Sequence, residues 1–159
     1  MGMGSTGRPE SKTGTVFFSR TYDEALSLVF EAREYLLGPG RLAVKDLSNE
    51  GSFCYATESL RLTTRLTESM AWLMYQRAIL EGEITAEQGR DENCYLQQQE
   101  TCLPETPSEH FPLLPAGLQS LLERSEALYR RIDRLDQQFR ASLEAEEGPK
   151  GPDTPDNPD

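Results

Sequence analysis

The residues of this chain that could carry out chemistry are few and lie far apart. His110 is the single histidine, and it lies in a proline-rich stretch as Ser-Glu-His-Phe. Acid–base or nucleophilic catalysis would need a second titratable group beside it. A metal-carboxylate site in a helical bundle would need Glu-x-x-His pairs, which this sequence lacks. We therefore expect no catalytic residue, no metal ion and no cofactor.

The three cysteines, Cys54, Cys94 and Cys102, stand in unrelated contexts. No two of them have the C-x-x-C spacing of zinc sites or thioredoxin-like redox motifs, and only His110 could serve one of them as a base. Free thiols that behave as small apolar residues in a reducing compartment are the simplest interpretation. The first residues also lack the apolar segment of a secretory signal, so the sequence favours a cytoplasmic protein.

The most unusual polar cluster is Arg61-Leu-Thr-Thr-Arg65. Residues three or four positions apart share a helix face. One interpretation is therefore a ladder of surface ion pairs, Glu58 with Arg61 and Arg65 with Glu68, which would contribute little to stability. The other interpretation is a clamp for an acidic partner protein. We take Arg61, Arg65 and Arg77 as candidate protein-binding residues.

These side chains must be positioned by a chain of 159 residues, which is enough for one domain of ordinary size. It has 16 Lys and Arg against 27 Asp and Glu, a net charge of -11. Such a charge disfavours nonspecific binding to nucleic acids and to anionic lipids, because both require a cationic protein surface. The longest apolar run, residues 70–75, is far shorter than the roughly 20 residues of a membrane-spanning helix. We expect no nucleic-acid partner and no membrane insertion.

Hydrophobic periodicity predicts an all-α fold in which three long helices, 21–37, 52–81 and 115–147, pack as an antiparallel bundle. The first would begin at a capping box formed by Thr21 and Glu24. Its apolar positions recur at helical spacing and are Tyr22, Leu26, Val29, Phe30, Leu36 and Leu37.

The last of these helices carries a regular heptad seam, in which apolar or small residues alternate three and four positions apart. The seam consists of Leu118, Leu121, Ser125, Leu128, Ile132, Leu135 and Phe139. Glu126 with Arg130, and Asp136 with Arg140, are acid-first pairs that we expect on the outside, each worth a few tenths of a kcal/mol. One face of this helix should therefore pack against the rest of the bundle.

A weaker helical segment is predicted over residues 85–99. Thr85 and Gln88 form a second capping box there, but most of the following residues are polar. Residues 100–117 contain four prolines, and we expect them to form a loop.

Both ends of the chain have the composition of disordered segments. Residues 1–15 are mostly glycine, serine, threonine and charged residues. Residues 148–159 are acidic, lack apolar side chains and have a proline at every third position, which opposes both helix and strand. The predicted folded domain is therefore 16–147.

The central helix is apolar on every side between Met70 and Tyr75. A helix that is apolar all round is normally buried all round, and three or four helices of one chain can hardly surround it. We therefore predict a homodimer, with Met70, Trp72, Leu73 and Tyr75 as core or dimer contacts. The alternative is that Trp72 or Tyr75 lies partly exposed at the rim.

The central helix also contains a series of motifs that resembles the core signature of the RcdA family, the bacterial regulators of CtrA degradation. The motifs are Glu58-Ser-Leu-Arg-Leu-Thr-Thr-Arg-Leu, Trp72-Leu, Gln76-Arg77-Ala and Glu81-Gly82-Glu. The late segment Ser125-Glu-Ala-Leu-Tyr-Arg-Arg-Ile-Asp-Arg-Leu135 is similar to that family's last helix. The resemblance covers roughly residues 17–143. Its middle motif is fairly specific, because a Thr-Thr pair between two arginines is an unusual choice within a helix.

The resemblance implies an all-helical, dimeric, non-enzymatic adaptor. Such a protein would help deliver substrates, including the transcription factor CtrA, to the ClpXP protease, together with CpdR and PopA and at a cell pole. Adaptors act by raising the effective concentration of a substrate near its enzyme. Two other hypotheses stay open. One is a bundle regulator that binds a small ligand or nucleic acid, which the net charge and the lack of a basic recognition helix disfavour. The other is an enzyme with an unrecognised site.

Overall fold

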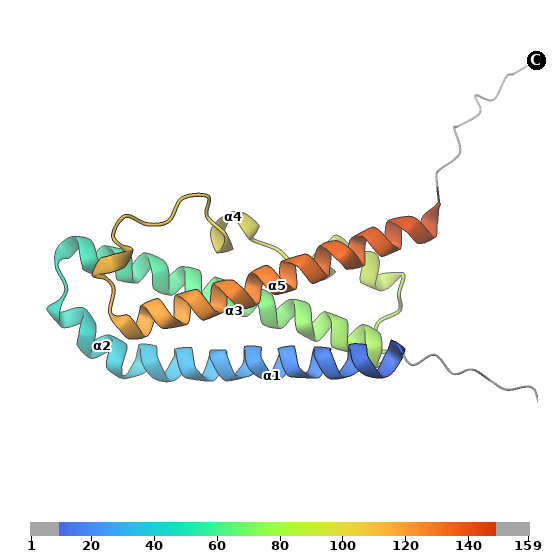
Figure 1. Cartoon of the computed structure of the whole chain (residues 1–159), viewed down its shortest axis with the longest axis horizontal. Helices are drawn as coiled ribbons and strands as arrows, with labels where there is room; N and C mark the ends of the chain where they lie inside the picture. Colours follow the sequence, from blue (N-terminus) through green and yellow to red (C-terminus); the bar gives the residue numbers. More distant parts are fainter. Residues whose placement is uncertain (1–9, 149–159) are drawn as a thin grey trace, which may run out of the picture.

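Three long helices lie side by side in the computed structural model, which describes residues 10–148 of the chain (Figure 1). They are α1 (Glu10–Leu37), α3 (Asn49–Leu80) and α5 (Ala116–Glu147). The shorter elements between them are α2 (Pro39–Ala43), η1 (Val44–Asp46), η2 (Gln88–Arg90), η3 (Glu92–Cys94), α4 (Gln99–Cys102) and η4 (Phe111–Leu113). The described part of the chain contains no strand, so the predicted all-α fold is confirmed.

α3 and α5 run in the same direction, and α1 runs opposite to both (Figure 1). Side-chain contacts agree with this arrangement, because Arg65 and Trp72 of α3 meet Glu126 and Asp136 of α5 in the same order. The predicted antiparallel bundle is therefore wrong for α5. The connection over residues 81–115 is long enough to return along the whole bundle, whereas a short connection would have forced neighbouring helices to be antiparallel.

α1 begins well before the predicted position. Thr21 lies inside the helix, where its hydroxyl donates to the carbonyl of Phe17 one turn earlier (3.1 Å). Glu24 pairs with Arg131 on α5 (2.7 Å) instead of returning to the backbone of Thr21. The predicted capping box is therefore wrong, and α1 includes residues 10–15, which were expected to be disordered. The other residues of the two predicted disordered ends, 1–9 and 149–159, lie outside the described residues.

The chain turns sharply after α1 and then starts α3 with an N-cap. α1 ends at Leu37, as predicted, and α2 follows at once. The Ser48 side chain then accepts a hydrogen bond from the backbone N–H of Gly51 (3.1 Å). α3 consequently begins at Asn49, slightly before the predicted residue 52.

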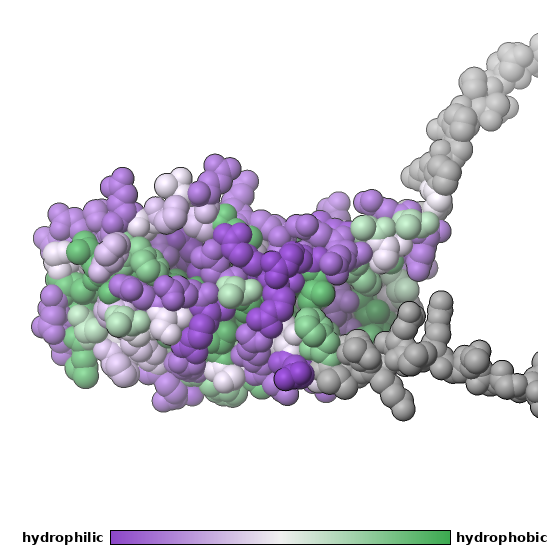
Figure 2. All heavy atoms as spheres, in the orientation of Figure 1, coloured by the Kyte–Doolittle hydropathy of each residue, from purple (hydrophilic) through white to green (hydrophobic). Residues whose placement is uncertain are grey.

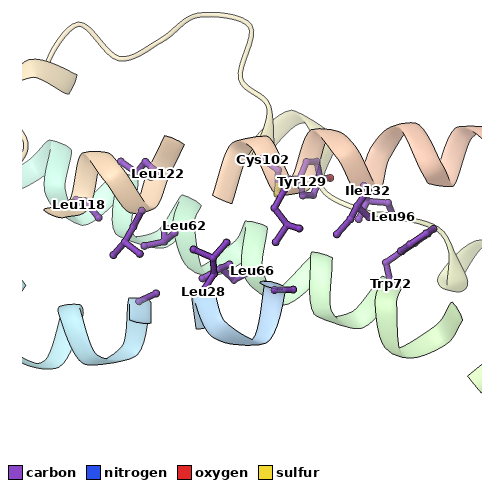
Figure 3. Close-up of a cluster of buried hydrophobic side chains, with 14 of the residues drawn as sticks. Leu28, Leu62, Leu66, Trp72, Leu96, Cys102, Leu118, Leu122, Tyr129 and Ile132 are labelled. Carbon is purple, nitrogen blue, oxygen red and sulfur yellow. The ribbon is translucent and has the colours of Figure 1, made fainter. Parts of the chain in front are cut away.

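The core runs along the length of the bundle between the three helices (Figure 3). Leu28 of α1 meets Leu66 of α3 near the middle, and Trp72 of α3 lies beside Ile132 of α5 (Figure 3). The first five seam residues of α5 are buried, and Leu135 packs partly buried against the same core. The predicted seam of α5 is therefore confirmed over these positions. The core residues with the lowest exposure are Ala25, Leu62, Leu73, Cys102, Leu118, Leu128, Tyr129 and Ile132.

Residues 85–99 do not form the predicted helix. The capping box does form, because Thr85 and Gln88 exchange side-chain and backbone hydrogen bonds (3.0 and 3.1 Å). Only the short turns η2 and η3 follow it. Gly89 lies so close to Ile79 that an added Cβ would come within 2.7 Å of it. Residues 85–99 have few apolar side chains to bury, so they do not form an amphipathic helix. They pack against α3 instead through the close approach of the Gly89 backbone to Ile79.

Two ion pairs join α1 to α5 along their exposed sides. Arg124 pairs with Glu31 (2.6 Å), and Arg131 pairs with Glu24 (2.7 Å). The hydrogen bond from Arg124, together with its charge, lowers the pKa of Glu31 despite an opposing effect of burial. Figure 2 shows the hydrophilic band that crosses this face of the molecule. Such pairs fix the register of the helices more than they stabilise them.

None of the helices that the structure describes is both long enough and apolar enough to cross a membrane.

Candidate functional site: an arginine cluster and an open helix face

Arg65 lies inside the bundle and not on its surface. Its side chain is 3% exposed, and it donates from Nε to the carbonyl of Cys102 (2.7 Å), from Nη1 to the carbonyl of Leu122 (3.2 Å) and from Nη2 to the carboxylate of Glu126 (3.2 Å). Because a guanidinium presents its donors in a fixed planar fork, this one side chain ties α3 to both α4 and α5. Its ion-pair partner is thus Glu126, and the predicted pair of Arg65 with Glu68 is wrong.

Arg61, one turn earlier on α3, holds the neighbouring carbonyl of α4. Its Nε donates to the carbonyl of Thr101 (2.9 Å), and its Nη1 donates to the carboxylate of Glu58, which confirms the predicted pair of Glu58 with Arg61. Thr101 and Cys102 are the last two residues of α4, whose final carbonyls have no partner within so short a helix. The two arginines therefore cap α4, and this role explains their spacing on α3.

The interior around this cluster holds a permanent positive charge. Burial lowers the pKa of Arg65, Glu126 counteracts that effect, and the charge of Arg61 adds to it. An arginine nevertheless stays protonated throughout the normal pH range. Burial also raises the pKa of the Cys102 thiol and of the Tyr129 hydroxyl, which donates to the carbonyl of Gln97 (2.7 Å). Neither of those two groups offers a nucleophile at neutral pH.

A cavity of about 300 Å³ lies beside the cluster, between α3, α5 and the segment after α4. Its charged lining consists of Glu58, Arg61, Arg65, Glu105, Glu123, Glu126 and Arg130. Glu126 also accepts a hydrogen bond from Arg130 (2.8 Å), which confirms that predicted pair. Within this lining Arg61 pairs with Glu58, and Arg65 and Arg130 pair with Glu126, so the three guanidinium groups already have carboxylate partners.

Arg77 stands apart from the other two candidate arginines. It lies in the last turn of α3, its side chain is 54% exposed, and its Nε donates to Glu81 (3.0 Å). Its guanidinium also lies 5.6 Å from the ring centre of Tyr22 on α1. The structure thus brings Arg61 and Arg65 together but not Arg77. Protein binding by these arginines stays a prediction, and Arg77 is the most exposed of the three.

The apolar turn of α3 divides into core and surface residues. Trp72 and Leu73 belong to the core, at 5% and 0% exposure, and Met70 and Tyr75 are half-buried. Trp72 and Leu73 are therefore core residues, and Tyr75 lies partly exposed at the rim of the bundle.

The burial of Asp136 was not predicted from the sequence. We expected its pair with Arg140 on the outside; the pair exists (2.7 Å), but the carboxylate is 1% exposed. Its other oxygen accepts a hydrogen bond from Nε1 of Trp72 (2.8 Å). Arg140 in turn covers the ring of Tyr95 at 4.1 Å. The available signal was Trp72 itself, because a buried indole N–H needs an acceptor.

One side of α3 presents an unpaired seam to solvent. Leu60 and Met74 are 71% and 59% exposed, and the residues Leu60, Thr63, Thr67, Met70 and Met74 follow one another at intervals of four and three positions. We call these five residues the open face. The last four line a groove of about 520 Å³ against α1. Alternating three- and four-residue intervals are typical of a seam that packs on another helix, and a search for a second seam in α3 could have found it.

Some large apolar residues of α1 are also turned outward. Ala25, Leu28 and Ala32 are buried, whereas Phe30 and Leu37 are 56% and 59% exposed. The prediction that these two residues lie on the buried face of α1 is wrong. Because alanine has a small side chain, α1 can lie close to its neighbours with an alanine-rich stripe.

His110 and the three cysteines differ in burial. His110 is exposed, and its backbone N–H donates to the hydroxyl of Ser108 (3.3 Å). Cys54, Cys94 and Cys102 are buried free thiols, which agrees with their interpretation as small apolar residues. That His110 has no catalytic role stays a prediction.

The fold and these contacts define a class of protein: an all-α, three-helix bundle in which two arginines of the central helix hold a connecting segment in place. A family described as a protein of unknown function, DUF1465, matches residues 10–155. The crystal structure of RcdA from Caulobacter crescentus CB15 is similar, with a TM-score of 0.62 and 42% sequence identity over 77% of this chain and 89% of that chain. The chain therefore belongs to the RcdA family, as the motifs of α3 predicted. No curated protein matches it.

Proposed function

We propose that this protein is a non-enzymatic adaptor that helps deliver cell-cycle regulators of the CtrA type to the ClpXP protease. The observation that supports this function best is the 42% identity with RcdA, which extends over most of both chains. The partners that the resemblance implies are CpdR, PopA and ClpX, together with substrates such as CtrA. The protein would act in the bacterial cytoplasm and transiently at a cell pole.

The arginine cluster, Arg61 and Arg65, supports an adaptor function because it holds the irregular connection between α3 and α5 against these two helices. Arg61 and Arg65 fix the end of α4 against α3 and α5 through four hydrogen bonds to carbonyls and a carboxylate of other segments. A surface that is already ordered loses less conformational entropy when a partner binds. The signature residues would then act mainly by holding the binding surface in shape.

We further propose that the protein is a homodimer that packs through the open face. The face offers exposed leucine and methionine side chains at the spacing of a helix seam, beside a groove of about 520 Å³. Two copies related by a twofold axis would present the same seam to each other. The half-buried Met70 would become a dimer contact, whereas Trp72 and Leu73 would serve the core of each copy.

The dimer can be tested by placing a charge in the open face. Leu60→Glu should raise the dissociation constant of the dimer at least about tenfold, because a buried, unpaired carboxylate opposes association. Light scattering coupled to size exclusion at tens of micromolar should give a dimer mass for the wild type and a monomer mass for the variant. Leu113→Glu, at another exposed leucine on η4, is the matched control and should remain a dimer. A monomeric wild type would refute the proposal.

Delivery can be tested by reconstituted proteolysis with purified ClpXP, CpdR, PopA and CtrA. The wild-type protein should accelerate degradation of CtrA. Arg77→Glu should reduce that acceleration about five- to tenfold if Arg77 is a contact of ordinary strength, and the side chain is exposed enough to leave the fold intact. Arg134→Glu is the control, because it changes the charge equally at an exposed position of a different helix, α5, and it should have little effect. Unchanged delivery by Arg77→Glu would remove Arg77 from the contacts, and no acceleration by the wild type would refute the adaptor.

A regulator that binds a small ligand is the second candidate function. The observation that favours it is the polar cavity of about 300 Å³ beside Arg61 and Arg65. Its mutually paired charges argue against a strongly charged ligand, so we rank this function below the adaptor.

A further inference from the structure

A second hollow lies at the corner of the bundle where α1 turns into α2 and meets the first turns of α3. Its volume is about 850 Å³, and its apolar lining includes Leu36, Leu37, Leu42 and Val44. Leu37 and Leu42 are 59% and 65% exposed, so the apolar surface there is open to solvent. Figure 2 shows hydrophobic side chains at this end of the molecule, where Figure 1 places α2. We call this space the corner hollow.

The corner hollow is also cationic. Arg41 and Lys45 line it, and no carboxylate does. In the described part of the chain most arginines pair with a carboxylate, including Arg61, Arg65 and Arg77. Arg41 and Lys45 have no such pair among residues 10–148, although the whole chain carries a net charge of -11. Two unpaired cations beside exposed leucines, in a protein rich in carboxylates, are the charge pattern of a site for an anionic and partly apolar ligand.

We propose that the corner hollow binds an acidic peptide segment of a partner protein, with the partner's apolar side chains against Leu37 and Leu42 and its carboxylates on Arg41 and Lys45. The hydroxyl of Ser52, which also lines the hollow, can hydrogen-bond to the backbone of such a segment. No residue of the open face or of the arginine cluster lines the hollow, although Leu36 lines both the hollow and the groove beside the open face. Binding of a peptide there does not depend on delivery to a protease.

The surroundings of the corner hollow favour a peptide over a nucleic acid or a membrane. Glu34, Asp46 and Glu50 are exposed in the same segments that form the hollow. A polyanion or an anionic membrane covers a wide surface and would meet these carboxylates, and it would find only two cations to offset them. A short peptide can instead place one or two carboxylates on Arg41 and Lys45 and avoid the rest.

A phage-displayed library of random dodecapeptides, selected on the full chain, tests this site without assuming a sequence. The enriched peptides should combine aspartate or glutamate with leucine, isoleucine or phenylalanine. Fluorescence anisotropy should then show at least about tenfold weaker binding of the best peptide to Arg41→Glu/Lys45→Glu than to the wild type. Binding should shift the amide resonances of residues 36–45 and 52–59 in the isotope-labelled chain.

The matched control is Arg20→Glu/Arg134→Glu. Both residues are exposed cations that form no ion pair with another described residue, and they lie outside the hollow. The double change alters the net charge equally. This variant should bind the peptide within about twofold of the wild type, because only long-range electrostatics changes. Leu42→Ser should also weaken binding, which separates the apolar contact from the charge.

Several results would overturn the proposal. These are the enrichment of peptides without acidic residues, no enrichment at all, and equal losses in the two charge-reversal variants. Binding that depends on Arg41 and Lys45 but is seen only with vesicles containing phosphatidylglycerol would assign the hollow to a membrane instead. Because none of these measurements uses a protease, failure of the peptide site and failure of the adaptor function are distinguishable.

Discussion

Replacing Arg65 by methionine should lower the free energy of unfolding by about 2–4 kcal/mol. The substitution keeps most of the buried volume and removes the three hydrogen bonds of the guanidinium. The carbonyl of Cys102 would then be left in the interior without its partner. Glu126 would lose less, because its side chain is 38% exposed and still pairs with Arg130. The expected loss is therefore close to the cost of unsatisfied buried groups and below that of a stranded buried charge.

Urea unfolding followed by far-UV circular dichroism measures this loss. Arg130→Met is the matched control, because it removes the same type of side chain from an exposed ion pair with the same partner, Glu126. It should cost no more than about 1 kcal/mol, the usual upper value for a surface ion pair. Arg65→Lys should fall between the two, since it keeps the charge but not the planar fork of donors. Equal losses for Arg130→Met and Arg65→Met would show that the buried contacts of Arg65 do not stabilise the fold.

Trp72→Ala should cost about 3–5 kcal/mol, the usual range when a large aromatic side chain is removed from a core. Trp72 is 5% exposed and packs between α3 and α5 near Ile132 (Figure 3). The substitution would leave a void there and would also take away the indole N–H that Asp136 accepts (2.8 Å). The same unfolding experiment measures it, and thermal unfolding should give the same order of variants.

Trp72→Phe separates the two parts of this effect. It keeps an aromatic ring in the core and removes only the hydrogen bond to Asp136, whose carboxylate still pairs with Arg140. We expect a loss of about 1–2 kcal/mol, mainly from the hydrogen bond and the smaller ring. If Trp72→Ala cost no more than Trp72→Phe, the indole would contribute nothing by packing. Trp72 would then behave as a partly exposed residue at the rim, which was the alternative considered from the sequence.

The sequence predicted what depends on spacing along one helix. The seam of α5 and the pair of Glu58 with Arg61 were found because their partners lie within two turns or share one regular face. The burial of Arg65 could not be found in this way, since its three acceptors lie 37, 57 and 61 residues away. Periodicity also gives the buried face of a helix and not its direction, so α5 was expected antiparallel to α3.

The side chains of some residues can form either of two local hydrogen bonds, and their type alone does not decide between them. A threonine such as Thr21 can cap a helix start or donate to a carbonyl one turn earlier, and only the residues before it decide which. The capping box of Thr85 and Gln88 shows the opposite case, because it formed without a helix behind it. A local hydrogen-bond motif stabilises the start of a helix, but a buried apolar face must sustain it.

The parallel course of α3 and α5 makes the two ends of the bundle unequal. Glu10 and Gly148, where the described chain begins and ends, lie at the same end, and the corner between α1 and α2 lies at the other (Figure 1). α5 spans the distance between them with 32 residues, about 48 Å at about 1.5 Å per residue. Whatever binds at the α1–α2 corner is therefore held at a fixed distance from the C-terminal end of α5.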